Sequence, residues 1–274
     1  MSMWKEKKEQ QAIFNGLADG ILIHESGPPG LSLPKERRLF AQKIANYIKK
    51  VRNGSVIIDA GCGKGTLLNE INCHVPNIYY MIGIDISSES LKVAKQKNED
   101  ADFIVCDIDA LPLRDKVAHM IIMENVLHHL PTLDSLSNLI PLLNSSGFML
   151  IDEKIRGNPL QDILTLAYPL IPYSFKMVLR EKDNHIDRYG HLPPIKPYSP
   201  KAFLKFIKQY SNRLTVVEVK YHDFFLFLRV LEYLSYVFPR ILSIQIPIHK
   251  LYFLEQRAIL RWSAVGMTVV LESI

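Results

Sequence analysis

The chain has 274 residues, 48% hydrophobic and 22% charged, with a formal net charge of +5 at pH 7. This length allows one large domain or a core domain with an added cap, and the composition excludes a disordered chain. The lysines are scattered, whereas nucleic-acid-binding proteins usually show a concentrated basic patch. The three cysteines have neither a metal-site spacing nor the even number of a disulfide framework. We therefore expect a cytoplasmic protein without a metal site.

Residues 1–50 are predicted to form an N-terminal helical arm. The first eleven residues are charged and polar, and no secretory apolar region follows them. After a Gly/Pro loop at 26–30, apolar residues recur at helical spacing between Glu36 and Val51. The arm is expected either to cover a ligand bound to the following residues or simply to pack against them.

The stretch from Val56 to Leu68 predicts a strand, a tight turn and a helix. An apolar run of Val and Ile ends in Asp59 and is typical of a strand buried on both faces. Glycines follow at alternate positions, where the missing Cβ lets the backbone turn tightly and a ligand approach closely. Leu67 and Leu68 then begin the apolar stripe of a helix. Such an arrangement is typical of a nucleotide site.

Two common nucleotide motifs do not fit this loop. The dinucleotide fingerprint G-x-G-x-x-G requires a third glycine where this chain has Thr66. The P-loop requires Ser or Thr after Gly-Lys, but Gly65 follows Lys64. Asp59 also repels a pyrophosphate and is better suited to a ligand that carries an amine.

Two further predicted strands also end in acids. The strand over 79–85 ends in Asp85, which lies 26 positions after Asp59. This separation is close to the roughly 20 residues expected for an acid that accepts the ribose hydroxyls of a nucleotide. A carboxylate can accept two O–H bonds at once, which suits a vicinal diol. The strand over 103–107 ends in Asp107. Three strands that each end in an acid are hard to obtain by accident, and they indicate a ligand site.

The sequence Asp59-Ala60-Gly61-Cys62-Gly63-Lys64-Gly65 closely resembles motif I, Asp-x-Gly-x-Gly-x-Gly, of the class I S-adenosylmethionine-dependent methyltransferases. The resemblance is strong over residues 54–153, and it implies S-adenosylmethionine as cofactor. In that family the acid after the third strand accepts a hydrogen bond from the adenine amine. The residues that the resemblance assigns to cofactor binding are Asp59, Gly61, Cys62, Gly63, Gly65, Asp85, Ile86, Asp107, Ile108, Glu124 and Asn125.

A fourth strand is predicted over 118–123, and the following segment from Glu124 to Pro131 resembles motif IV of the small-molecule methyltransferases. In that family this segment passes under the methionine moiety and borders the acceptor. His128 is a candidate general base, with packing below the acceptor pocket as the alternative. His128 and His129 point in different directions if they lie on a helix, so they do not form a metal site.

The remaining pattern completes an α/β fold, a Rossmann-like, doubly wound, seven-stranded sheet. A helix is expected over 135–143, a turn at 144–147 and a fifth strand over 148–153. Ser199-Pro200 begins another helix, with Ser as N-cap and Pro at the first helical position. Strands over 214–221 and 265–271 are expected to form the antiparallel pair of the resembled fold.

Residues 51–274 thus form the predicted methyltransferase domain, with insertions at about 158–198 and 222–263. Residues 160–179 are apolar but contain charges and two prolines, which favours a lid over a membrane span. A polar cluster that follows supplies two more catalytic candidates, Tyr189 and His191. The second insertion, rich in aromatic residues, is expected to form amphipathic helices as a C-terminal cap. Its role is left open among a core cap, a homodimer surface, an apolar acceptor pocket and a membrane-surface contact.

The sequence therefore predicts an enzyme that transfers a methyl group from S-adenosylmethionine to a small, apolar or lipid-like acceptor. The acceptor atom is an oxygen, a nitrogen or a carbon. Methylation of RNA or of a protein is the alternative enzyme function. A protein that binds the cofactor without turnover is the alternative from another class.

Overall fold

The computed structural model describes residues 7–8, 11–12, 15, 33–75, 79–155, 198–222 and 266–274. The predicted insertions therefore lie almost entirely outside the described residues. Tyr189 and His191 lie outside them as well. Among the described residues, no helix has the length and apolar character needed to cross a bilayer.

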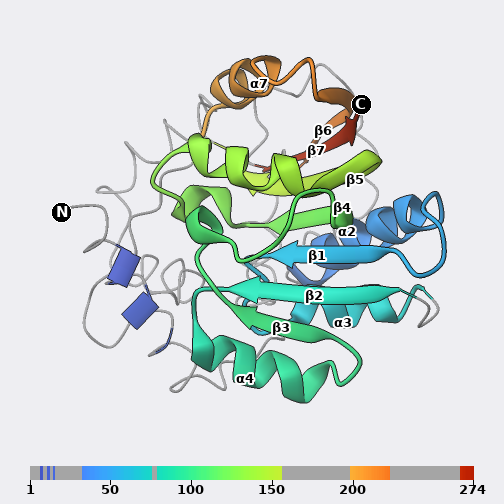
Figure 1. Ribbon diagram of the computed structural model, residues 1–274, viewed down its shortest axis with the longest axis vertical. Coiled ribbons are helices and arrows are strands. Elements are labelled where there is room, and N and C mark those ends of the chain that lie inside the picture. The colour runs from blue at the N-terminus through green and yellow to red at the C-terminus, as the bar shows by residue number, and fades with distance from the viewer. Residues whose placement is uncertain are drawn as a thin grey trace, which may run out of the picture.

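The described strands form one seven-stranded sheet with the order β3-β2-β1-β4-β5-β7-β6 (Figure 1). The strands are β1 (Val56–Ala60), β2 (Tyr80–Asp85), β3 (Asp102–Val105), β4 (Ala118–Glu124), β5 (Leu143–Lys154), β6 (Leu214–His222) and β7 (Gly266–Ser273). β1 to β5 are parallel, and β7 is antiparallel to both β5 and β6. The predicted fold class and the antiparallel final pair are confirmed.

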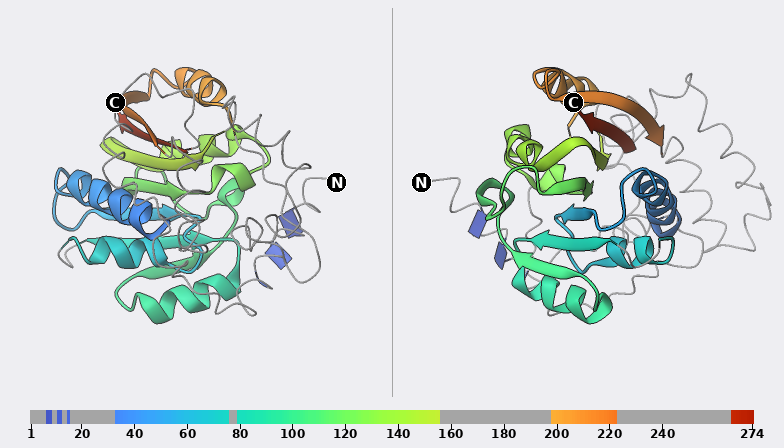
Figure 2. Two further views of the ribbon diagram at one scale, coloured as in Figure 1. Left: turned by 180° about the vertical axis from the view of Figure 1, so that it is seen from behind. Right: turned by 45° about the vertical axis from the view of Figure 1, so that its right-hand side comes forward.

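Three α-helices cover one face of the sheet: α2 (Leu33–Ile48), α3 (Thr66–Asn72) and α4 (Ser88–Lys97) (Figure 2). The apolar stripe predicted after Glu36 is buried, with Phe40, Ile44 and Ile48 at most 4% exposed. These side chains share a core with Ile57 and Ile122 of the central strands. Helix α2 therefore belongs to the domain core.

The other face is covered by helix α7 (Pro200–Lys208) and short 3-10 helices. The 3-10 helices are η1 (Ile108–Ala110), η2 (Leu127–His129), η3 (Leu133–Asn138) and η4 (Ile140–Leu142). The predicted α-helix over 135–143 is therefore wrong. Pro141 has no N–H to donate, and the hydroxyl of Ser137 donates a hydrogen bond to the carbonyl of Asp134. Short 3-10 turns therefore replace a regular α-helix.

Strand β5 is longer than predicted, because it begins at Leu143 and includes the expected turn at 144–147. Its register against β4 shifts between Ala118 and Met120. Ser146 has a positive φ of 61°, and Gly147 packs against the carbonyls of Asn144 and His119. The turn residues thus form an irregular start of the strand, beside the beginning of β4.

Candidate functional site

The three predicted strand-end acids lie at the carboxyl edge of the sheet. Asp59 is in β1, Asp85 is the last residue of β2, and Asp107 follows β3 as the N-cap of η1. The strands are parallel neighbours, with Asp59 in register with Gly83 and Asp85 with Val105. Parallel strands place their carboxyl ends along the same edge, where ligands of open α/β sheets bind.

The glycine loop adopts the left-handed conformation at each of its three glycines, Gly61 (φ 80°), Gly63 (φ 50°) and Gly65 (φ 69°). A Cβ at Gly61 would lie 2.5 Å from Val126, and one at Gly65 would lie 2.6 Å from Asn98. A Cβ at Gly63 would meet no atom within 4 Å. Gly61 and Gly65 are thus required by protein contacts, whereas Gly63 borders open space.

Asp85 is held by the backbone on both sides of its carboxylate. The N–H of Gly63 donates to Oδ2, and the N–H of Ser87 donates to Oδ1, each at 2.8 Å. Burial raises the pKa of Asp85, and backbone hydrogen bonds from Ser87, Gly63 and Ile86 oppose that rise. Each carboxylate oxygen has a second lone pair, so the anchored group can still accept hydroxyl donors.

Asp59 is 1% exposed, and its Oδ2 has no hydrogen-bond partner in the described structure. Burial raises its pKa well above the usual range, and the nearby charges of Glu124 and Asp85 add to this rise. Arg37 opposes it. A buried carboxylate with an unused oxygen costs free energy unless a cation reaches it. Asp59 therefore has the properties of a receptor for a ligand ammonium group.

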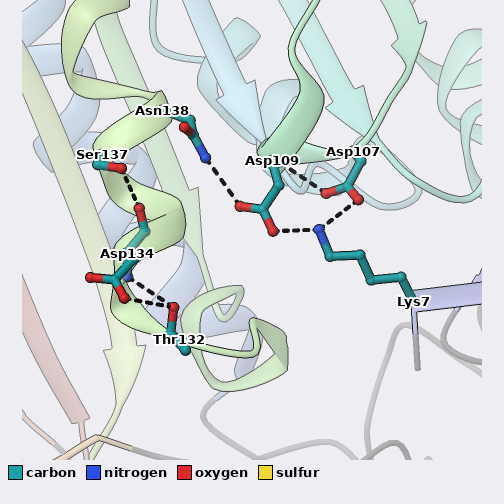
Figure 3. A network of polar contacts seen from close by, with 7 residues as sticks. All are labelled: Lys7, Asp107, Asp109, Thr132, Asp134, Ser137 and Asn138. Carbon is teal, nitrogen blue, oxygen red and sulfur yellow. Dashed lines mark hydrogen bonds and ion pairs between the residues drawn. The ribbon is translucent and has the colours of Figure 1, made fainter. Parts of the chain in front are cut away.

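Asp107 contacts an N-terminal lysine (Figure 3). Lys7 Nζ donates to Asp107 Oδ2 at 2.7 Å and also pairs with Asp109. Burial lowers the pKa of Lys7, but the hydrogen bonds to the two carboxylates outweigh that effect and raise it. Asn138 donates to the other oxygen of Asp109 at 3.1 Å. In this state the Lys7 ammonium occupies the carboxylate assigned to the adenine amine.

Two more residues of the arm contact the same edge. Gln11 Nε2 donates to the carbonyl of Ile86 at 2.9 Å. Asn15 Oδ1 accepts a 2.8 Å hydrogen bond from the hydroxyl of Ser87, beside Asp85. Lys7, Gln11 and Asn15 are four positions apart in the sequence, a spacing that places residues on one face of a helix. These three described residues thus lie against the ends of β2 and β3, where we predicted the ribose and adenine.

Glu124, at the end of β4, pairs with Arg37 from α2 at 2.9 Å. Burial raises the pKa of Glu124; Arg37 opposes that rise, and the nearby charge of Asp152 adds to it. Asn125 follows with a positive φ of 55° and donates its N–H to the carbonyl of Asp152 at 2.8 Å. Arg37 was not recognised from the sequence, because an arginine in an amphipathic helix normally lies in solvent.

His128 lies in η2 and is 3% exposed. Its Nδ1 contacts the carboxylate of Glu153, which also accepts hydrogen bonds from the backbone of Leu127 at 2.6 Å and of Lys154 at 2.8 Å. The Glu153 carboxylate therefore fixes both the imidazole and the turn that carries it. His128 thus has a buried carboxylate partner, and its role as a general base or in packing below the acceptor pocket stays a prediction.

A second histidine–carboxylate pair, absent from our predictions, lies on the opposite face of β5. His222 Nε2 is 2.9 Å from Asp152 Oδ1, and the hydroxyl of Thr268 donates to the same oxygen at 2.5 Å. A Cβ at Gly266 would lie 2.1 Å from the His222 ring, so this glycine makes room for the imidazole. No local sequence pattern indicates this pair, because His222 lies in β6 and Asp152 in β5, with Thr268 added from β7.

The residues at the carboxyl edge fit S-adenosylmethionine. The unsatisfied, buried Asp59 oxygen suits the methionine ammonium, and the anchored Asp85 suits a ribose diol. The open space at Gly63 gives a ligand room to approach the backbone. Cys62 contributes no reactive thiol here, because its side chain is buried and burial raises its pKa. Ile108 is buried, and Ile86 is half-buried at the ends of the same strands.

Comparison with known proteins supports this interpretation. Residues 52–176 match a family model described as a methyltransferase domain. A tRNA (carboxymethyluridine(34)-5-O)-methyltransferase of Arabidopsis thaliana is 34% identical over 132 residues, which cover 47% of this chain and 31% of that protein. The probable tRNA methyltransferase 9B of Homo sapiens is 28% identical over 131 residues, or 44% of this chain and 27% of that protein. The match thus spans about a third of these relatives at most.

Solved structures with the same fold cover nearly the whole chain. A geranyl diphosphate C-methyltransferase from Streptomyces coelicolor has a TM-score of 0.58 at 14% identity, covering 98% of both chains. A geranyl diphosphate methyltransferase in complex with sinefungin has a TM-score of 0.60 at 13% identity, covering 98% of this chain and 100% of that one. At these identities the likeness concerns the fold alone.

Three independent observations now agree. The glycine-rich sequence after β1 matches motif I, the order of the strands is that of the Rossmann-like methyltransferases, and the matched family model covers the same residues. Residues 52–176 therefore carry a methyltransferase domain, and the sheet around it has the Rossmann-like fold of the class I S-adenosylmethionine-dependent methyltransferases.

Proposed function

We propose that this protein binds S-adenosylmethionine at the carboxyl edge of the sheet and transfers its methyl group to an acceptor. The observation that carries this proposal is the row of acids Asp59, Asp85 and Asp107, with one buried oxygen of Asp59 left unsatisfied. Asp59 accepts from the ammonium, Asp85 from the ribose hydroxyls and Asp107 from the adenine amine. S-adenosylmethionine supplies a methyl group activated by its positively charged sulfur.

The protein contributes alignment and the exclusion of water. Gly61, Gly63 and Gly65 let the backbone pass close to the cofactor, while the Arg37–Glu124 pair holds the end of β4 beside Asp59. Holding the acceptor atom in line with the methyl group removes much of the entropic barrier of a two-body reaction. We assign His128 a positioning role, since Glu153 holds its buried ring.

For the acceptor, our first candidate is a small, apolar or lipid-like molecule. Its support is the composition of residues 160–179 and 223–265, which are rich in aliphatic and aromatic side chains. The described part of the carboxyl edge is also dominated by acids, which would repel a polyanion. In this proposal the insertions at 158–198 and 222–263 form the acceptor side, with Tyr189 and His191 among its polar groups.

The second candidate is an RNA, and the relatives favour it. Several proteins similar to this chain are named as tRNA methyltransferases, among them the Arabidopsis thaliana protein with 34% identity over 132 residues. Scattered lysines had made RNA the weaker choice in the sequence. Because the match spans only a third of those relatives, the similarity concerns the catalytic domain, and parts of them that hold tRNA can lie elsewhere.

A methyl-transfer assay separates these candidates. The purified chain is incubated with methyl-labelled S-adenosylmethionine and either an apolar lipid extract or total tRNA, and the label is followed into each fraction. Label in the lipid fraction supports the first candidate, and nuclease-sensitive label supports the second. Tight binding of S-adenosylhomocysteine without transfer to any fraction would instead favour a protein that binds the cofactor without turnover. Absence of binding would overturn the cofactor assignment itself.

A further inference from the structure

A cleft of about 470 Å³ lies at the amino edge of the sheet, opposite the acids. Its walls come from the residues after α2, from the start of β4 and from the irregular start of β5. The lining residues are Lys50, Val51, Arg52, Lys116, His119, Asn144, Ser145, Ser146 and Gly147. Three of these are permanent cations, one is a histidine, and none is an acid.

The cations of this cleft are not engaged with carboxylates. Across the residues that the structure describes, no ion pair joins Lys50, Arg52 or Lys116 to an acid. Lys50 Nζ instead lies 4.0 Å from the ring centroid of Tyr47, a cation–π contact that restrains the ammonium. Such a concentration of positive charge attracts anions from solution.

His119 supplies an oriented donor. Its Nδ1 accepts a 3.2 Å hydrogen bond from the N–H of Val56, so the neutral ring carries its proton on Nε2. Burial lowers the pKa of His119, and the charge of Arg52 lowers it further. A bound anion would offset the charge of Arg52 and therefore favour the protonated imidazole.

We propose that this cleft is a binding site for a ligand that carries phosphate groups. The donors are three cationic groups, the His119 ring, the Asn144 amide and two serine hydroxyls. Phosphate oxygens accept only hydrogen bonds and carry negative charge, so they match a wall that offers donors and no carboxylate. Among these lining residues Val51 has the only purely aliphatic side chain, and most of the others can donate a hydrogen bond. Its volume accommodates more than a single phosphate.

Two sources share this chemistry: a small polyphosphate compound, and the backbone of an RNA. The site lies at the edge away from the proposed cofactor site, so it concerns a second ligand or a distant part of a large one. Loss of anion binding can therefore be measured independently of S-adenosylhomocysteine binding. A failure of this proposal leaves the proposed function untouched.

The test is a pH titration of the His119 ring by NMR, with and without millimolar pyrophosphate. The titration midpoint of His119 is expected to move upward with pyrophosphate, because the anion stabilises the charged ring. Calorimetry should show binding that weakens about tenfold or more in the double variant Arg52→Ala/Lys116→Gly. Glycine is chosen at 116 because Lys116 has a positive φ of 56°, so this change leaves the backbone unstrained.

The control variant is Lys201→Ala/Lys205→Ala, which removes two cations from the exposed side of α7. It should bind pyrophosphate like the wild type, and both double variants should retain S-adenosylhomocysteine binding. A single-stranded RNA oligonucleotide that binds more tightly than pyrophosphate, and loses affinity only in the cleft variant, identifies RNA as the source. Equal or weaker RNA binding identifies a small compound. An unmoved His119 midpoint, or equal loss in both variants, overturns the proposal.

Discussion

The two edges of the sheet carry opposite charge. The carboxyl edge contains Asp59, Asp85 and Asp107, whereas the amino edge contains the cleft with Lys50, Arg52 and Lys116. The acids lie at the ends of β1, β2 and β3, whereas the cleft lies where β4 and β5 begin, and neither charge cluster is contiguous in sequence. The difference shows that an overall charge of +5 says little about partners. Folding places the two signs at opposite edges of the sheet.

The edges also differ in how their charges are balanced. At the carboxyl edge two cations partly neutralise the acids. Lys7 comes from the arm and Arg37 from α2. At the amino edge no described acid pairs with the three cations. Variants placed in pairs, one at each edge, can therefore separate an effect of the cofactor site from a general effect on the fold.

A large effect on cofactor binding is expected for Asp85→Ala. The carboxylate is the proposed acceptor of the ribose hydroxyls, and each hydrogen bond to a charged group contributes about 1.5–3 kcal/mol. S-adenosylhomocysteine should therefore bind tenfold or more weakly, as measured by calorimetry. The control is Asp102→Ala, an exposed acid at the amino end of β3, which should bind normally. Wild-type affinity in a folded Asp85→Ala protein would remove this residue from the site.

A similar comparison can be made with glycines. Gly63→Ala should lose cofactor binding, because its Cβ would enter the open space left for the ligand, and should keep most of its thermal stability. Gly54→Ala has a comparable positive φ, 75° against 50°, and no neighbour within 4 Å, but it lies before β1 at the other edge. Each change should cost about 1–2 kcal/mol of stability, and only the first should affect binding. Equal binding by both variants would make the loop a mere turn.

Gly61→Ala should behave differently from Gly63→Ala. Its Cβ would lie 2.5 Å from Val126, so protein packing is disturbed before any ligand arrives. We expect a loss of stability larger than that of Gly63→Ala, seen as a lower Tm without ligand. This result would correct the simpler expectation that both glycines serve only the cofactor. A Tm equal to that of Gly63→Ala would show that Val126 moves aside at little cost.

Asp59→Asn should stabilise the folded protein and should lower its affinity for the cofactor by a few-fold. The pKa of Asp59 is raised on folding, so above its unfolded pKa the folded state holds more protons than the unfolded state. This acid therefore lowers stability as pH rises from its unfolded pKa to its raised folded pKa. The asparagine variant lacks that loss and should show a higher Tm at neutral pH and a flatter pH profile in thermal melts. A Tm below that of the wild type would contradict this account.

The smallest effect is expected for Lys7→Met. Lys7 contacts Asp107 without ligand, so the adenine amine must share or displace it. Removing the ammonium should speed association of S-adenosylhomocysteine, because no contact has to be displaced, and should change its affinity by no more than about threefold. Stopped-flow rates at low and high salt would measure this, with the exposed neighbour Lys8→Met as control. Identical rates in both variants would exclude Lys7 from cofactor entry and release.

The central part of the fold followed from the sequence because each strand and its terminal acid lie together in the chain. Val56 to Asp59 shows both the buried strand and the carboxylate near its end, and the glycines explain the turn. Local chemistry also predicted Ser199 as the N-cap of α7, where its hydroxyl accepts from the N–H of Ala202. Such features depend on a few neighbouring residues.

What the sequence did not reveal depends on residues far apart in the chain. The Arg37–Glu124 pair spans 87 positions, and the Lys7–Asp107 pair spans 100. The cations at the amino edge looked scattered because they follow α2 and precede β4, and meet only in the folded sheet. The prediction of a regular helix over 135–143 failed for a local reason. Pro141 lies inside this segment and interrupts the backbone hydrogen bonds of an α-helix.

The two histidine–carboxylate pairs on β5 have a consequence for how the sheet is aligned. Asp152 and Glu153 are neighbours and point to opposite faces, where they hold His222 and His128. A slip of β5 by one residue would turn each carboxylate to the wrong face and break both pairs together. The same slip would also remove the hydrogen bond from Asn125 to the Asp152 carbonyl. The pairs thus lock the alignment of the strand that joins the parallel and antiparallel halves of the sheet.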